Sequence, residues 1–98
     1  MRETIHKLKV TDDILELIRG AHPHIKTKIR FALKEILKDP YSGKALKDEL
    51  AGLSSFRAGN FRIIYKPLKD KIIEIVAVGP RKSIYEETYR IIQRERKT

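Results

Sequence analysis

The spacing of apolar residues changes once along this chain of 98 residues, and that change limits the elements it can form. Between Ile25 and Leu37, apolar residues recur every three or four positions, which is the repeat of one helix face. From Ser54 onward they alternate with polar residues, which is the repeat of a strand with one buried face. The sequence therefore predicts an α+β fold in which helices precede an antiparallel sheet.

Two antiparallel helices are expected before this change of period. Thr11 is suited to cap a first helix that Gly20 ends. The second helix should end before Pro40, because the residue preceding a proline avoids the helical region. Residues 3–10 alternate weakly and are expected to form a first strand, whereas residues 41–53 are expected to be a connector.

A hairpin is expected around the pair Gly59-Asn60, which suits a two-residue turn. This turn places Arg57 opposite Arg62 on one face, and it assigns the other face to the core residues Phe56, Ala58, Phe61 and Ile63. Like charges directly opposite each other destabilise a sheet by about 0.2–1 kcal/mol. Arg57 and Arg62 are therefore interpreted as a site for an anion, which two guanidinium groups can bind. The alternative is an ion pair of one arginine with Glu74 on the neighbouring strand.

The rest of the second half predicts a third strand and a final helix. A turn at 67–70 leads into Ile72–Val78, a run rich in β-branched residues that completes an antiparallel meander. Ser83 opens the final helix, with Arg81 just before it and Tyr85 just inside it. Side chains at a sheet end beside a helix N-terminus are well placed to meet an anion.

Charge and composition favour a polyanionic partner. The formal net charge is +9, and residues 54–98 hold 11 basic and 5 acidic residues against 11 and 8 in residues 1–53. The absence of cysteine excludes disulfides and zinc–thiolate sites, and His22 and His24 lack a third ligand, so no metal and no cofactor are expected. No apolar run approaches a membrane span, and residues 1–10 lack the apolar core of a signal peptide, so a soluble cytoplasmic protein is expected.

Three stretches resemble the RelE/ParE toxin superfamily of type II toxin–antitoxin systems. The hairpin Phe56-Arg57-Ala58-Gly59-Asn60-Phe61-Arg62-Ile63-Ile64-Tyr65 resembles the family's "YRVGDYRVIY", Val78-Gly79-Pro80-Arg81-Lys82-Ser83-Ile84-Tyr85 resembles its closing "IGHRKDVY", and Asp39-Pro40 with Leu46 and Leu50-Ala51-Gly52-Leu53 resembles its middle. The resemblance covers nearly the whole chain in the expected order. It implies a single RelE-like toxin domain over residues 1–98, with an antiparallel sheet, an N-terminal helical hairpin packed on it and a C-terminal helix.

The resemblance also implies a function and its residues. RelE-type members cut mRNA on the ribosome, need no metal and are silenced by a cognate antitoxin, and their catalytic positions correspond to Arg62, Arg81 and Tyr85. Arginines stabilise charge on the phosphate, and Tyr85 is the candidate general base. The basic residues expected to contact RNA phosphates are Arg57, Lys44, Lys47 and Lys82.

Departures from the family pattern keep two alternatives open. Pro80 and Ile84 stand where some members have histidine, and Leu53 and Ser55 stand where some nucleases have lysine. The first alternative is a ParE-type inhibitor of DNA gyrase, and the second is a catalytically degenerate RNA-binding homologue. Residues 86–98 extend past the closing tyrosine, either to pack on the sheet or to bring a basic end to ribosomal RNA.

Overall fold

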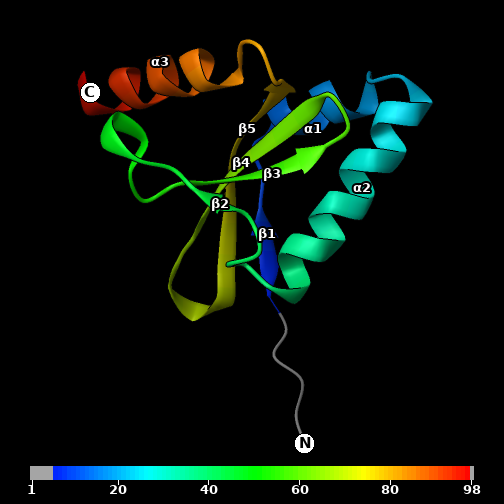
Figure 1. The fold of residues 1–98 in the computed structure, drawn as a ribbon, viewed down its shortest axis with the longest axis horizontal. Helices are drawn as coiled ribbons and strands as arrows, with labels where there is room; N and C mark the ends of the chain where they lie inside the picture. Colours follow the sequence, from blue (N-terminus) through cyan, green and yellow to red (C-terminus); the bar gives the residue numbers. More distant parts are fainter. Residues whose placement is uncertain (1–5, 98) are drawn as a thin grey trace, which may run out of the picture.

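The computed structural model describes residues 6–97, which form a five-stranded sheet and three α-helices (Figure 1). In chain order these are β1 (Lys7–Lys9), α1 (Asp12–Arg19), α2 (Pro23–Lys38), β2 (Lys44–Ala45), β3 (Ser54–Ala58), β4 (Phe61–Pro67), β5 (Ile72–Pro80) and α3 (Ile84–Lys97). Short 3₁₀ turns, η1 (Asp48–Leu50) and η2 (Lys69–Lys71), precede β3 and β5. The predicted α+β fold is confirmed.

The sheet has the strand order β1-β5-β4-β3-β2. The antiparallel meander of β3, β4 and β5 is confirmed, and β2 extends it as an antiparallel edge strand. The other edge differs from the expected all-antiparallel sheet, because β1 runs parallel to β5 and makes the sheet mixed. The predicted first strand lies partly outside the described residues, and β2 and η1 occupy the predicted connector.

Each face of the sheet carries its own apolar core, and α2 and α3 lie on opposite sides of the sheet (Figure 1). On one face, α1 and α2 bury Ile14, Ile29 and Ile36 against the meander. On the other face, α3 buries Ile84, while Ile91 and Ile92 pack at the margin of the same cluster. Burial of such side chains stabilises the fold by about 1.5–3 kcal/mol each. The C-terminal extension therefore packs on the sheet.

A β-bulge in β5 sets which residues meet each core. The strand pairs Ile64 with Ala77 but Tyr65 with Ile75, so Val76 is an extra residue without a partner. Val76 and Ala77 consequently both contact the core under α3. Among the described residues, no helix is long and apolar enough to cross a membrane.

Candidate functional site

The hairpin has the predicted register. Ala58 pairs with Phe61 and Arg57 with Arg62, around the turn Gly59-Asn60. Gly59 has φ 64°, a left-handed conformation that glycine adopts without steric cost, whereas Asn60 does not have a positive φ. This pattern is that of a type II′ turn, whose twist suits antiparallel strands. The two arginines are thus fixed opposite each other by the backbone.

The arginine face is the face of the hairpin that carries Ser55, Arg57 and Arg62. The two guanidinium groups point apart along the strands: Arg57 Nε donates to the Gly59 carbonyl at 3.3 Å, toward the turn, and Arg62 Nη1 lies 3.5 Å from Ser55 Oγ, away from it. Within residues 6–97 neither arginine forms an ion pair. The alternative pairing with Glu74 is wrong, because Glu74 lies opposite Lys66 and forms its ion pair with Lys9 at 4.0 Å.

The structure brings Arg62 and Tyr85 together around Ser55. Tyr85, on α3, has its Oη 3.2 Å from Ser55 Oγ. Arg62, on β4, approaches the same Ser55 atom with its Nη1. Tyr85 reaches this position because its neighbour Ile84 is fully buried and fixes the first turn of α3 on the sheet. Arg62 Nε is buried and has no partner among the described residues. An unpaired buried donor costs about 1–3 kcal/mol, so the Arg62 guanidinium lowers the stability of the folded domain.

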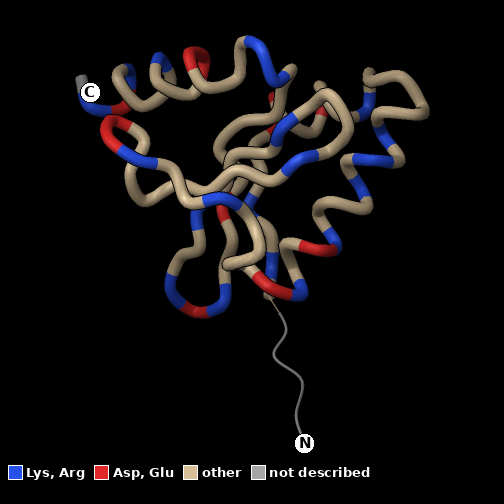
Figure 2. Tube along the Cα trace, in the orientation of Figure 1, with Lys and Arg blue, Asp and Glu red and all other residues tan. Residues whose placement is uncertain are grey.

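Arg81 lies at the hairpin turn but does not touch this cluster. Its backbone N–H donates to the Asn60 carbonyl at 2.9 Å, two positions after Gly79, which pairs with Arg62. Its side chain is exposed and, among residues 6–97, forms no hydrogen bond or ion pair. Figure 2 shows basic segments on both arms of the hairpin and at the turn before α3. The turn thus places Arg81 beside the arginine face and leaves its guanidinium free to reach a ligand.

The predicted phosphate-contacting lysines are all exposed. Lys44, on β2, pairs with Ser55, so its side chain lies on the arginine face next to the Ser55 hydroxyl. Lys44 and Lys47 line a shallow hollow of about 290 Å³, whose wall also includes Asp48 and Leu50 of η1. Lys82 lies in the turn before α3 and, among the described residues, forms no hydrogen bond or ion pair with the cluster. The structure therefore brings Lys44 to the cluster and leaves Lys47 and Lys82 at its margins.

The loop that positions Lys44 is tied to the core by Tyr65. The fully buried Tyr65 hydroxyl donates to the Pro40 carbonyl at 2.8 Å and accepts from the Gly43 N–H at 3.0 Å. Burial raises the pKa of Tyr65 above its ordinary value of 10.0. A Cβ at position 43 would lie 2.5 Å from the Tyr65 hydroxyl, so only glycine allows this close approach.

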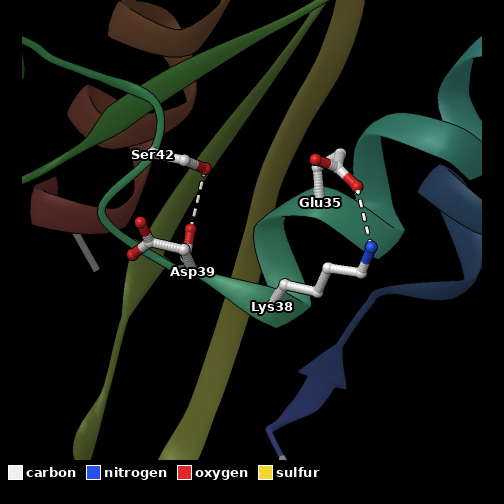
Figure 3. A network of polar contacts seen from close by, with 4 residues as sticks. All are labelled: Glu35, Lys38, Asp39 and Ser42. Carbon is white, nitrogen blue, oxygen red and sulfur yellow. Dashed lines mark hydrogen bonds and ion pairs between the residues drawn. The ribbon is translucent and has the colours of Figure 1, made fainter.

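The same loop closes on itself after α2. Ser42 Oγ donates to the Asp39 carbonyl at 2.7 Å, and Lys38 pairs with Glu35 at 3.4 Å in the last turn of α2 (Figure 3). The Asp39 carboxylate accepts from the Tyr41 N–H at 3.0 Å. Together with the Tyr65 anchor, this turn leads the chain directly into β2.

Ser55 is the residue of the cluster that the sequence did not single out. It is only 1% exposed, although it faces the same side as two charged arginines. The strand alternation contained the signal, because residue 55 precedes Arg57 by two positions and must share its face. What alternation does not show is that α3 brings Tyr85 onto the same hydroxyl.

The two neighbouring histidines form a stacked pair and not a larger ligand group. The rings of His22 and His24 have centroids 5.5 Å apart, and the described part of the chain contains no group of three or more possible metal ligands. His22 Nδ1 instead accepts from the His24 N–H and caps α2.

Fold and site together define a small basic α+β domain that carries two opposed arginines on the exposed face of a hairpin. The sequence model for the ParE toxin of the type II toxin–antitoxin system parDE matches residues 7–85, and the chain belongs to this family within the RelE/ParE superfamily. It is thus a toxin of the type II toxin–antitoxin class. No curated protein sequence matches it significantly.

Solved toxin structures share the fold. The toxin–antitoxin complex RelBE2 from Mycobacterium tuberculosis matches with 26% identity and a TM-score of 0.68, over 80% of this chain and all (100%) of that chain. A mutant of Escherichia coli RelE in the free state matches with 18% identity and a TM-score of 0.71, over 93% and 98% of the two chains. The archaeal RelE–RelB complex from Pyrococcus horikoshii matches with 21% identity and a TM-score of 0.64, over 80% and 97%.

Proposed function

We propose that this toxin is a ribosome-dependent mRNA endonuclease that inhibits translation in the cytoplasm and is silenced by a cognate antitoxin. The observation that supports the nuclease is the convergence of the Arg62 guanidinium and the Tyr85 phenol on one hydroxyl, on a face where neither Arg57 nor Arg62 forms an ion pair within residues 6–97. Several of the similar solved toxins were crystallised with their antitoxins, which supports the antitoxin partner.

The proposed reaction is an attack of the ribose 2′-oxygen on the adjacent phosphorus. Tyr85 accepts the proton of the 2′-hydroxyl, the bond from phosphorus to the 5′-oxygen breaks, and the products are a 2′,3′-cyclic phosphate and a 5′-hydroxyl. Arg62 and Arg81 donate to the phosphate oxygens, whose negative charge grows in the transition state. A proton from a neighbouring cation or from water completes the leaving group.

The remaining basic residues are proposed to hold the RNA around the reacting phosphate. Arg57 and Lys44 flank the cluster on adjacent strands, and Lys47 and Lys82 lie farther out along the path of the chain. Exposed cations of this kind contribute sequence-independent affinity. The face is shallow, so alignment of the 2′-oxygen for attack is assigned to the ribosome, which fixes the mRNA conformation.

Primer extension on mRNA from a translation reaction tests this proposal. Wild-type protein should give new 5′ ends within the coding region only when ribosomes are present, and Arg62→Ala and Tyr85→Phe should each reduce them by about 10²–10³. Arg30→Ala, which removes an exposed arginine of α2, is the matched control and should cut normally. Intact mRNA with wild-type protein at high concentration would contradict a nuclease.

A second candidate function is inhibition of DNA gyrase. The match to the ParE model favours it, since ParE-type members are gyrase poisons. A supercoiling assay with purified gyrase separates the two: inhibition at stoichiometric toxin, together with intact translated mRNA, would support the ParE-type activity. A protein that binds ribosomes without cutting or blocking gyrase would be the degenerate homologue.

A further inference from the structure

Ser55 is a polar side chain enclosed where an apolar one would fit. It is 1% exposed, and its neighbours across the strands on the same face include Ile64, which is fully buried. Its backbone is already paired, with Lys44 of β2 on one side and Ile64 of β4 on the other, so the strand does not need the hydroxyl. Among the described side chains, its Oγ forms hydrogen bonds with Tyr85 and Arg62 alone.

The chemistry of these three groups gives the hydrogen bonds a direction. A guanidinium only donates, so Arg62 Nη1 donates to Ser55 Oγ. The serine retains one O–H donor and a further lone pair, and its other neighbour is the Tyr85 oxygen at 3.2 Å. When Tyr85 carries negative charge it can only accept, and the serine must then be the donor. A chain from guanidinium through hydroxyl to phenolate places a positive end behind the base.

We propose that Ser55 is a positioning residue for the cleavage reaction, holding the Tyr85 oxygen and the Arg62 guanidinium at one phosphate. This inference deepens the proposed nuclease function and rests on it. Ser55 does not touch RNA: the sheet and α3 enclose it, and it acts through its two neighbours. During the reaction it keeps its own proton, while Tyr85 takes the one from the 2′-hydroxyl.

Three serine variants of the full-length toxin test the assignment. Ser55→Ala should lower the rate constant for cleavage on mRNA-programmed ribosomes by about 10- to 100-fold, less than the loss of a general base. The concentration of toxin for half-maximal rate should stay within about twofold, because ribosome contacts are untouched. Ser55→Thr retains the hydroxyl and should restore at least half the loss on a logarithmic scale. Ser54→Ala removes the adjacent serine, which interacts with Tyr65, and should cut normally.

A second measurement does not need activity. In protein whose tyrosines are labelled with ¹³C at the ring carbon that bears the phenol oxygen, NMR detects one signal for each tyrosine. The chemical shift of that carbon changes when the hydrogen bonding of the oxygen changes. The chain has four tyrosines, and Tyr85→Phe identifies the signal of Tyr85. That signal should move in Ser55→Ala at neutral pH, return toward wild type in Ser55→Thr and stay fixed in Ser54→Ala.

The outcomes distinguish this inference from the proposed function. Normal cleavage by Ser55→Ala, or an unmoved Tyr85 signal, overturns the positioning role while the nuclease stands. A wild-type protein that cuts nothing overturns the nuclease and the reaction role together, even if the signal moves. A loss of cleavage that Ser55→Thr does not restore, with an unfolded Ser55→Ala, assigns Ser55 to packing alone and also overturns the proposal.

Discussion

Replacement of Arg62 by methionine should make the protein more stable and, if the proposed function holds, inactive. Methionine keeps a flexible apolar stem of similar length and removes only the guanidinium. That group lies opposite Arg57, and its Nε is buried without a partner among residues 6–97. A residue maintained for structure alone would not combine these two costs.

The magnitude follows from three contributions. Loss of the like-charge pair gains about 0.2–1 kcal/mol, and loss of the orphaned donor gains about 1–3 kcal/mol. Loss of the long hydrogen bond to Ser55, 3.5 Å in length, costs up to about 0.5–1.5 kcal/mol. The net expectation is that unfolding of Arg62→Met requires about 1 kcal/mol more, equivalent to a rise in Tm of about 4–8 °C for a chain of this size.

Equilibrium unfolding in urea, followed by far-UV circular dichroism, measures this difference, and primer extension measures activity. Arg57→Met is the matched control: it removes the same charge pair but no buried donor, so its gain should stay below about 1 kcal/mol. The reasoning is refuted if Arg62→Met unfolds at lower urea than wild type, because the guanidinium would then be a net stabilising group in the folded protein.

Three other perturbations test the elements around the site. Tyr65→Phe should destabilise the protein by about 1–3 kcal/mol in urea unfolding, since the Pro40 carbonyl and the Gly43 N–H lose their partner; unchanged stability would show that water replaces the hydroxyl. Because the pKa of Tyr65 is raised in the folded state, its contribution is present below about pH 10 and falls as pH rises through the raised value. Wild type should therefore lose more stability than Tyr65→Phe between pH 9 and roughly 11.5, and parallel curves would contradict this. Lys44→Ala should weaken ribosome-dependent cleavage by roughly fivefold, or about 1 kcal/mol, and this deficit should shrink as the salt concentration rises. Lys34→Ala, on the exposed side of α2, is the control and should cut normally. Equal losses in the two variants would mean that only the net charge of the protein matters.

Local signals in the sequence were sufficient for the hairpin and most of the helices. Alternation and the Gly59-Asn60 turn fixed the pairing of Arg57 with Arg62, because a two-residue turn permits one register. Thr11 caps α1 through its side-chain oxygen, as expected from its residue type. These features depend on residues within a few positions of one another.

The parts that could not be predicted depend on long-range packing. The parallel pairing of β1 with β5 joins residues 65 positions apart, Lys7 and Ile72, and no local pattern encodes it. The meeting of Tyr85 with Ser55, 30 positions apart, follows only once α3 folds back on the sheet. The β2 strand is two residues long and reads as connector in any sequence window.

The bulge in β5 acts as a change of phase within one strand. Ile73 and Ile75 face the core under α1 and α2, and Val78 faces it too, although an uninterrupted strand would turn residue 78 to the opposite side. The extra residue also turns Gly79 to the side of Arg62, its partner on β4. If the same sequence paired without the bulge, Val78 would lie opposite Arg62, so that a valine would stand against the guanidinium. A single inserted residue, with no chemistry of its own, thus places a glycine opposite the arginine, at a position where a Cβ would lie 3.0 Å from the Ile84 side chain that anchors α3.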